Sequence, residues 1–211
     1  MIERLRRSRI AFKLYEYGLV DIDSIYASEY YASMDRETAI QDANQLADTI
    51  IDIYSPDNVI EFGCGTGRLL YRYTERGITV YGIDASSSAL EQSKLPDECL
   101  QQHDLTQPFS TEEKYDIALA IEILEHLPQK AADTVVDSIS NAAKTVLVSA
   151  ATPGQGGTHH VNEQPHAYWI EKFETRGMTY QPSTTEKIRS QLKLDDLMWI
   201  SDNLIVFKKD E

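Results

Sequence analysis

Short apolar runs alternate with amphipathic stretches along most of this 211-residue chain. Runs of five to seven mainly apolar or β-branched residues predict strands at 58–62, 78–83, 115–121, 145–150 and 203–208, and a further short strand is predicted at 100–103. Between them, apolar residues recur at helical spacing, which predicts helices over 36–54, 67–76, 86–94, 128–142, 166–176 and 183–194. Ser86 is expected to cap the third of these helices, and Ser183 with Glu186 predicts a capping box for the last.

The order of these elements predicts an α/β fold with a doubly wound, mostly parallel sheet. Strands that read as continuous apolar runs are typical of sheets covered by helices on both faces. The last strand is expected to run antiparallel, because little chain separates it from the strand before it. We divide the chain into an N-terminal helical segment, residues 1–54, packed on a domain of residues 55–211.

Composition narrows the class of protein. Hydrophobic residues make up 42% of the chain, which is enough for a buried core, and no apolar run approaches the roughly 18 residues that a membrane span needs. The cysteines are Cys64 and Cys99, without a CxxC motif. We therefore expect no disulfide framework, no cysteine zinc site and a reducing, cytoplasmic compartment.

The charge of the chain is acidic overall and basic at its start. The net charge of −14 disfavours nucleic acid, which is a polyanion. Residues 1–13 hold five basic residues and one acidic residue. We interpret this basic stretch either as the solvated face of a helix or as an arm for an anionic partner.

The strongest local signal is a glycine-rich run, Val59-Ile60-Glu61-Phe62-Gly63-Cys64-Gly65-Thr66-Gly67-Arg68. A strand enters a glycine turn and a helix begins on its far side, which is the architecture of a nucleotide-cofactor site. Arg68 stands where a dinucleotide fingerprint has its third glycine, and no Gly-Lys-Ser/Thr follows, which argues against a nicotinamide dinucleotide and against a P-loop. An acid at Glu61 suits a cofactor that carries positive charge.

Two further acids follow the next two predicted strands. Asp84 can accept both ribose hydroxyls of an adenosine, and the alternative is a surface carboxylate at a strand end. Asp104 can meet the amino group of adenine while Leu105 packs on the ring, and the alternative for Asp104 is a turn or cap residue.

On these motifs, residues 58–150 resemble the cofactor half of class I S-adenosylmethionine-dependent methyltransferases. The resemblance extends through the predicted fourth strand into Ile121-Glu122-Ile123-Leu124-Glu125-His126-Leu127. It implies a Rossmann-like, seven-stranded sheet of order 3-2-1-4-5-7-6, with S-adenosylmethionine as cofactor. The residues that it implies for cofactor binding are Glu61, Gly63, Cys64, Gly65, Gly67, Asp84, Ala85, Asp104, Leu105, Ile121 and Glu122.

The same resemblance gives the N-terminal segment a function. In this family the helices before the domain often fold over the cofactor as a lid. Five tyrosines in this segment either exclude water and stack on an acceptor, or pack against the rim of the sheet: Tyr15, Tyr17, Tyr26, Tyr30 and Tyr31.

A polar loop at residues 152–165 is expected to carry the acceptor side. The loop follows a predicted strand, as do the glycine turn, Asp84, Asp104 and Glu122, so all of them share the rim where doubly wound folds bind ligands. Its Pro-Gly-Gln-Gly-Gly and His-x-Asn-Glu-Gln runs are similar to a segment of a group of small bacterial and archaeal methyltransferases, in which glycine is more usual at the position of His159. This resemblance points to a small-molecule or sugar-like acceptor.

Methyl transfer to a hydroxyl benefits from a base near neutral pKa, and we expect His160 to be that base, with His126 second. An acceptor-binding or structural role for His160 is the alternative. We therefore predict an O-methylating, S-adenosylmethionine-dependent methyltransferase. The competing hypotheses are a non-catalytic S-adenosylmethionine-binding regulatory protein and an NAD-dependent oxidoreductase.

A sharper alternative places a divalent metal at Glu122, Glu125 and His126, together with His160 or His166. Such a site resembles that of the small-RNA 2′-O-methyltransferases that use an ExxEH motif. The motif is also common in metal-free methyltransferases, and the acidic charge disfavours RNA. The sequence-based prediction is therefore a site without metal.

Overall fold

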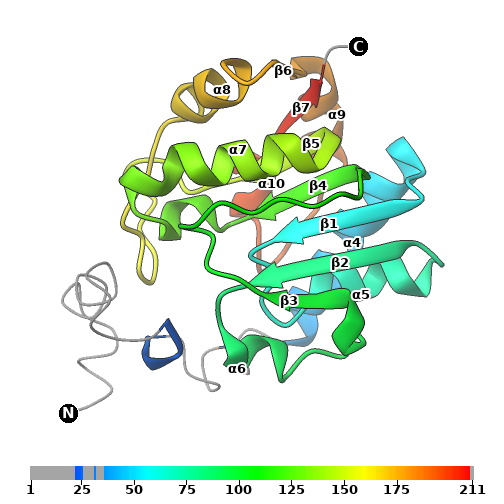
Figure 1. Ribbon diagram of the computed structural model, residues 1–211. Helices are drawn as coiled ribbons and strands as arrows, with labels where there is room; N and C mark the ends of the chain where they lie inside the picture. Colours follow the sequence, from blue (N-terminus) through cyan, green and yellow to red (C-terminus); the bar gives the residue numbers. More distant parts are fainter. Residues whose placement is uncertain (1–21, 26–30, 32–35, 210–211) are drawn as a thin grey trace.

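The computed structural model describes residues 22–25, 31 and 36–209, which are built around a seven-stranded sheet of order β3-β2-β1-β4-β5-β7-β6 (Figure 1). The strands are β1 (Asn58–Phe62), β2 (Thr79–Asp84), β3 (Leu100–Gln102), β4 (Tyr115–Ile121), β5 (Ala143–Ser149), β6 (Met178–Tyr180) and β7 (Ile205–Lys209). The first five pair in parallel, and β7 runs antiparallel to both β5 and β6. The predicted fold class, strand order and antiparallel last strand are confirmed.

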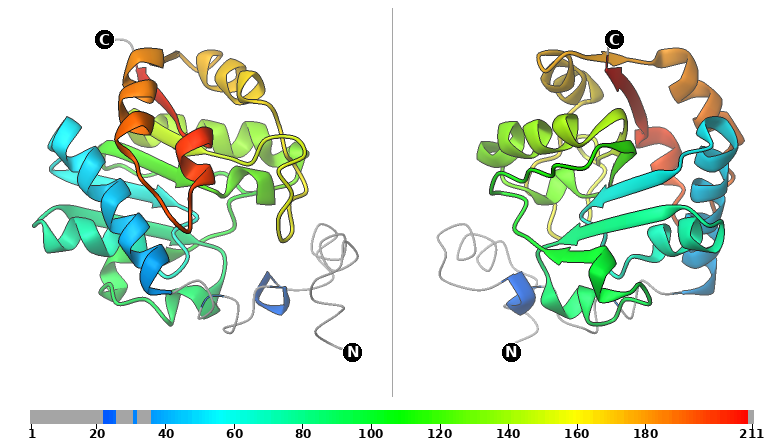
Figure 2. Two further views of the ribbon diagram at one scale, coloured as in Figure 1. Left: turned by 180° about the vertical axis from the view of Figure 1, so that it is seen from behind. Right: turned by 45° about the vertical axis from the view of Figure 1, so that its right-hand side comes forward.

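Helices connect the strands and form a layer on each face of the sheet (Figure 2). They are α4 (Glu37–Tyr54), α5 (Arg68–Glu75), α6 (Ser87–Leu90), α7 (Ala132–Ala142), α8 (His166–Glu174), α9 (Pro182–Gln191) and α10 (Trp199–Asn203). Short 3₁₀ turns lie at η1 (Ile22–Ser24), η2 (Asp97–Cys99), η3 (Leu124–His126) and η4 (Gln129–Ala131). None of the helices in these described ranges has the length and apolar character needed to cross a membrane.

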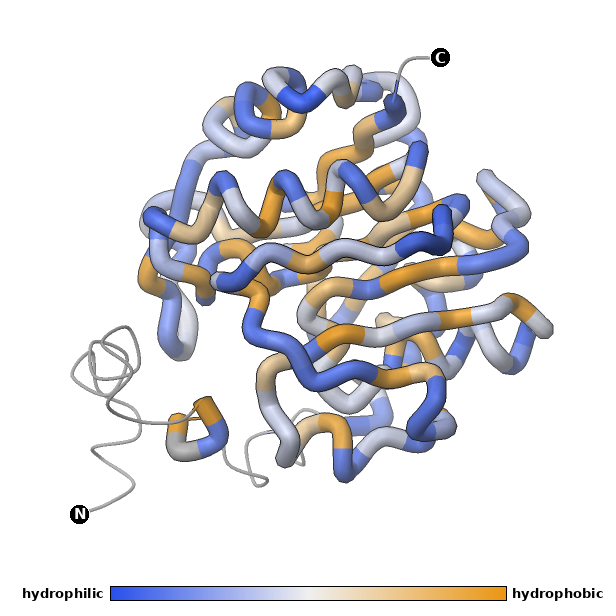
Figure 3. Tube along the Cα trace, in the orientation of Figure 1, coloured by the Kyte–Doolittle hydropathy of each residue, from blue (hydrophilic) through white to orange (hydrophobic). Residues whose placement is uncertain are grey.

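The sheet separates two hydrophobic cores. Ile60 packs with α7 and α8 on one face, whereas its neighbour Val59 packs with α4, α5 and α9 on the other. The same alternation holds along the central strands, because successive side chains of a strand point to opposite faces. Both faces are therefore apolar, and the strands form the hydrophobic centre of the molecule (Figure 3).

The elements that differ from the prediction are short or atypical. No separate signal predicts β6, a three-residue strand at the sheet edge, or α10, about one and a half helical turns before β7. Ser86 does cap α6 by accepting from Ala89 N at 3.1 Å, but α6 ends at Leu90 rather than near residue 94. The predicted capping box is wrong, because α9 begins at Pro182, so Ser183 lies inside the first turn.

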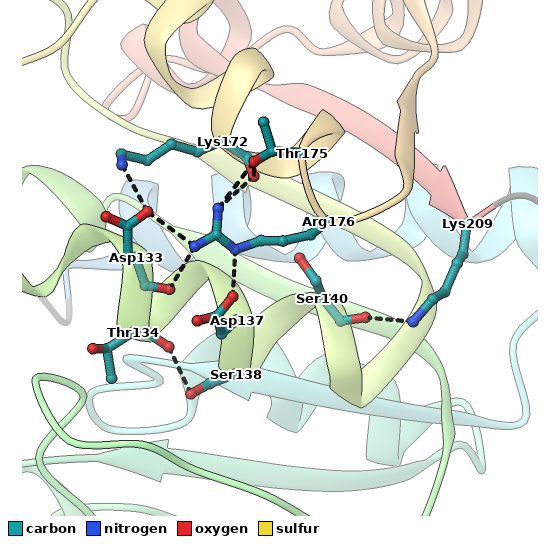
Figure 4. Close-up of polar contacts among 9 residues, drawn as sticks. All are labelled: Asp133, Thr134, Asp137, Ser138, Ser140, Lys172, Thr175, Arg176 and Lys209. Atoms are coloured by element: carbon teal, nitrogen blue, oxygen red, sulfur yellow. Dashed lines mark hydrogen bonds and ion pairs between the residues drawn. The ribbon is translucent and has the colours of Figure 1, made fainter.

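An ion-pair network fixes α8 on α7 (Figure 4). The guanidinium of Arg176 donates to Asp133 and Asp137, and Lys172 Nζ lies 2.8 Å from Asp133 Oδ1. Both aspartates are exposed, so each pair contributes at most about 1 kcal/mol to the free energy of unfolding. These ion pairs matter more for where α8 lies than for stability, because α8 follows directly after the polar loop at residues 152–165.

Candidate functional site

A cavity of about 230 Å³ opens beyond the carboxyl ends of β1, β2, β3 and β4. Parallel strands bring these ends to one edge of the sheet, so residues far apart in sequence share the cavity wall. Of the residues predicted to bind the cofactor, all but Gly67 line it: Glu61, Gly63, Cys64, Gly65, Asp84, Ala85, Asp104, Leu105, Ile121 and Glu122. Gly67 lies just outside, as the N-cap of α5.

The turn after β1 depends on glycine at several positions. Gly63, Gly65 and Gly67 have φ of 77°, 55° and 70°, a backbone conformation that residues other than glycine rarely adopt. Space is restricted as well, because a Cβ at Gly63 would overlap the side chain of Ile123. The N–H groups of Gly63 and Cys64 both donate to Ile83 O, at 2.7 and 3.0 Å, which ties the turn to β2.

Asp84 both supports the turn and faces the cavity. Its Oδ2 accepts from Gly65 N at 2.8 Å and its Oδ1 accepts from Ser86 N at 2.9 Å. Burial raises the pKa of the carboxyl, and these two bonds oppose the shift. An ionised carboxylate has about four acceptor positions, so the backbone bonds to Asp84 leave room for a ligand.

Asp104 is a turn residue that also lies in the cavity wall. Its Oδ1 accepts from Thr106 N at 2.8 Å, which stabilises the turn after β3. Its side chain also lines the cavity beside Leu105, which is buried. Asp104 therefore both stabilises the turn after β3 and forms part of the cavity wall.

Glu61 is a buried acid at the floor of the cavity. Burial raises the pKa of its carboxyl to about 8, with Asp84 adding to the shift and Arg68 opposing it. Its Oε2 has no hydrogen-bond partner among the described residues, which is costly for a buried oxygen. A cationic donor in the cavity would satisfy this oxygen.

Cys64 has a structural explanation. Its thiol is buried, and burial raises the pKa of that thiol well above its ordinary value. A Cβ added at Gly82 would lie 2.8 Å from the Sγ of Cys64, so the thiol packs closely against the backbone of β2. Cys64 therefore acts as a small packing residue of the turn.

Part of the cavity wall comes from segments without a recognised motif. Residues from α4 and from the chain around α10 line it: Ala43, Leu46, Leu197, Trp199 and Ile200. Buried Asp42 of α4 positions the second group, because its carboxylate accepts from the backbone N–H groups of residues 195, 196 and 197 at 3.1, 2.7 and 2.8 Å. No local pattern links Asp42 to a segment about 150 residues away.

The N-terminal segment reaches the cavity at two described positions. Ile22 and Tyr31 line the wall, and Tyr31 lies beside Gly65. Asp23 holds this segment at the start of α6, where its carboxylate accepts from the hydroxyl and the N–H of Ser87 at 2.7 and 3.2 Å. The other four tyrosines of the predicted lid and the basic stretch at 1–13 lie outside the described residues.

The polar loop docks on η3 through its backbone. Val161 N and Asn162 N each donate to Glu125 O at 3.0 Å. Glu163 gathers the rest of the loop, since its carboxylate lies 2.9 Å from Gly154 N, 2.8 Å from Gly156 N and 3.0 Å from His160 Nδ1. These contacts lower the pKa of Glu163.

Two positions of the polar loop, 157 and 159, favour glycine, one through packing and the other through its backbone conformation. A Cβ at Gly157 would overlap the imidazole of His160, so only glycine fits there. His159 has φ of 66°, a conformation that favours glycine. This conformation explains why glycine is the more usual residue at that position in the similar segments.

The two predicted catalytic histidines lie together but not equally close to the cavity. Their rings meet edge to face with centroids 5.0 Å apart, and only His126 lines the cavity. Burial lowers the pKa of His126 to about 3, so its imidazole is neutral. His166, the first residue of α8, is not part of this pair, since its side chain interacts with Asn203 of α10.

Two glutamates stand next to these histidines. Glu122 directly follows β4, has φ of 53° and donates its N–H to Ser149 O at 3.0 Å. Glu125 is fully buried, and burial together with the charge of Glu122 raises the pKa of its carboxyl to about 8. Ligand atoms of Glu125, His126 and His160 all lie within 4.8 Å of one another.

Comparisons with known proteins agree with this geometry. Residues 60–145 match the family described as a methyltransferase domain. A ubiquinone biosynthesis O-methyltransferase of Nitrosomonas europaea is 33% identical over 105 residues, which cover 46% of this chain and 44% of that protein. A magnesium protoporphyrin IX methyltransferase of Arabidopsis thaliana is 30% identical over 100 residues, which cover 44% of this chain and 32% of that protein. The matches thus span less than half the length of these curated relatives.

The fold is shared more widely than the sequence. The structure of a TehB-like S-adenosylmethionine-dependent methyltransferase from Corynebacterium glutamicum superposes with a TM-score of 0.65 at 18% identity, over 87% of this chain and 98% of that one.

Proposed function

We propose that this chain, whose residues 60–145 match a methyltransferase domain, is a class I S-adenosylmethionine-dependent methyltransferase that methylates a hydroxyl of a small-molecule or sugar-like acceptor. The observation that carries the proposal is the cavity at the strand ends, which joins the glycine turn to four acidic side chains: Glu61, Asp84, Asp104 and Glu122. Its apolar wall and its few polar groups are typical of a small-molecule site.

The residues present fit the methyl donor part by part. Glu61 has a buried oxygen without a described partner, which matches the ammonium group of the methionine portion. Asp84 keeps acceptor positions for the ribose hydroxyls, and Asp104 with Leu105 suits adenine. The glycine turn lets the ligand approach the bare backbone.

Methyl transfer is an in-line displacement at carbon, in which positioning and exclusion of water supply most of the rate. S-adenosylmethionine, when bound, supplies a methyl group that its positive sulfur makes electrophilic. The chain excludes water with the apolar wall contributed by Tyr31, Leu197 and Ile200. It orients the acceptor with His126, whose neutral imidazole can accept a hydrogen bond from a hydroxyl.

Proton removal from the acceptor is the role predicted for His160. In the structure His160 lies behind His126, and its Nδ1 lies 3.0 Å from Glu163 Oε1, which fixes the orientation of the ring.

The proposal is tested by incubating the protein with S-adenosylmethionine and pooled hydroxylated small molecules and sugars. We expect S-adenosylhomocysteine to form, together with a product 14 Da heavier than its acceptor, and Asp84→Asn to abolish both. A protein that binds the donor and leaves every compound unmodified would instead be the non-catalytic regulatory protein considered above.

A further inference from the structure

A cluster of metal-ligating side chains lies at the edge of the cavity. Glu125 and His126 come from η3, and His160 comes from the polar loop, 34 residues later in the chain than His126. The backbone bonds from Val161 and Asn162 to Glu125 O hold these two segments together. Ligands that converge from separate segments onto one point form a defined site.

Glu125 is the residue that indicates a ligand. Its side chain is fully buried, and neither carboxylate oxygen has a hydrogen-bond partner among the described residues. An unpaired buried carboxyl is costly, so buried acids are normally hydrogen-bonded, paired with a charge or bound to a metal. Glu122, whose charge acts on Glu125, increases the negative potential at the same place.

The histidines are held in the orientation that metal ligands adopt. His126 Nδ1 lies 3.3 Å from His159 O, and His160 Nδ1 lies 3.0 Å from Glu163 Oε1. A backbone carbonyl and a carboxylate only accept, so the Nδ1 of each histidine carries the hydrogen in these contacts, and a metal would be bound through Nε2 of the neutral ring. Histidines that bind a metal usually donate their other N–H to a carbonyl or a carboxylate in this way.

We propose that Glu125, His126 and His160 bind a divalent metal ion. Two imidazole nitrogens and one carboxylate favour Mn²⁺, Fe²⁺, Co²⁺ or Zn²⁺ over Ca²⁺, which prefers oxygen ligands alone. Three protein ligands leave further coordination positions open, and Glu122 or a small molecule can occupy them. The proposal reverses the metal-free site expected from the sequence.

The position of the ion narrows the class of acceptor, and this part of the inference rests on the proposed function. His126 belongs both to the cluster and to the cavity wall, so an ion there has access to the cavity. An acceptor with a hydroxyl, or with two adjacent oxygen donors, can fill the open positions and be held beside the methyl donor. The acceptor is therefore an oxygen nucleophile.

The test measures Mn²⁺ binding to the full-length, chelator-treated protein, with neither donor nor acceptor present. Free Mn²⁺ is followed by its electron paramagnetic resonance signal during titration. We expect one strongly bound Mn²⁺ per chain. Glu125→Gln and His160→Ala should abolish this binding, and Glu163→Gln should weaken it about 10- to 100-fold, because Glu163 orients His160.

Matched controls separate loss of the site from loss of the fold. Glu186→Gln removes an exposed carboxylate of α9, and His103→Ala removes an imidazole distant from the cluster in sequence, so both should bind Mn²⁺ as the parent protein does. Glu125→Gln keeps the size of the side chain, and its melting temperature should match or exceed that of the metal-free parent. Wild-type protein that binds no Mn²⁺ at millimolar concentration, or cluster variants that bind as well as wild type, would overturn the metal site.

The outcome is independent of the proposed function. S-adenosylhomocysteine binding is measured in the same samples, and Glu125 does not line the cavity that would hold it. Protein that binds S-adenosylhomocysteine but not Mn²⁺ contradicts the metal site alone. Protein that binds Mn²⁺ but not S-adenosylhomocysteine contradicts the proposed function alone.

Discussion

Gly63 combines a left-handed backbone with direct packing against Ile123, so a methyl group there is excluded twice. Gly63→Ala should lower the free energy of unfolding by about 1–3 kcal/mol and should abolish binding of S-adenosylhomocysteine. Both effects are measured by denaturant unfolding and by titration calorimetry.

Gly177→Ala is the matched control for this change. Gly177 also has a positive φ, of 74°, but a Cβ there meets nothing within 4 Å. It should show only the strain cost of about 1 kcal/mol and bind the ligand normally. Equal ligand binding by the two variants would contradict the role of the turn.

Glu61 makes stability depend on pH. In the folded protein its pKa is about 8, whereas its ordinary value is 4.5. Between these values the unfolded chain has lost the proton that the folded protein keeps, so stability falls as pH rises. Glu61→Gln has no such proton, and its stability relative to wild type should therefore increase from pH 5 to pH 8, by up to several kcal/mol.

Melting temperatures of both proteins across this pH range test the Glu61 prediction. Other titrating groups are common to the two proteins and cancel in the comparison. Parallel curves would show that the burial of Glu61 does not raise its pKa.

At the scale of elements, α4 positions the segment that leads into α10. Asp42→Ala removes the acceptor for three N–H groups, which should reduce the free energy of unfolding by about 1–3 kcal/mol. It should also weaken S-adenosylhomocysteine binding, because Leu197, Trp199 and Ile200 line the cavity. Asp52→Ala, on an exposed position of the same helix, should change neither quantity. Normal ligand affinity in Asp42→Ala would separate this segment from the site.

The location of the predicted site residues could be inferred where local signals were strong, whereas their binding roles stay a prediction. The glycine turn and Asp84 each follow an apolar strand, and parallel strands bring such ends, and Asp104 after β3, to one edge without further information. β6 and α10 were missed because three and five residues are too few to show a period. Trp199 and Asp42 were missed as site residues because their positions depend on a contact between distant segments.

The polar loop shows a second limit. Its composition indicated a functional rim, but which histidine reaches the cavity depends on how the backbone folds onto η3. His160 is the predicted base, but His126 lies in the cavity wall and His160 lies behind it. Likewise, the spacing of Glu125 and His126 did not reveal that the carboxylate of Glu125 is buried with no hydrogen-bond partner in the described part of the chain.

At the scale of the whole molecule, strand order decides the location of the site. Strands β2 and β3 are added on one side of β1, and β4 and the later strands on its other side. The cavity lies at this change of order, between the glycine turn and the end of β4. The two cores keep the sheet rigid beneath it. Segments on the rim can therefore differ between relatives while the donor site stays in place.

The most direct test of the account is titration calorimetry of the purified protein with S-adenosylhomocysteine. We predict saturable binding of one molecule per chain, weakened at least about tenfold by Asp84→Asn, since a charged hydrogen-bond acceptor is lost. Absence of binding by the wild-type protein to both S-adenosylmethionine and S-adenosylhomocysteine would contradict it.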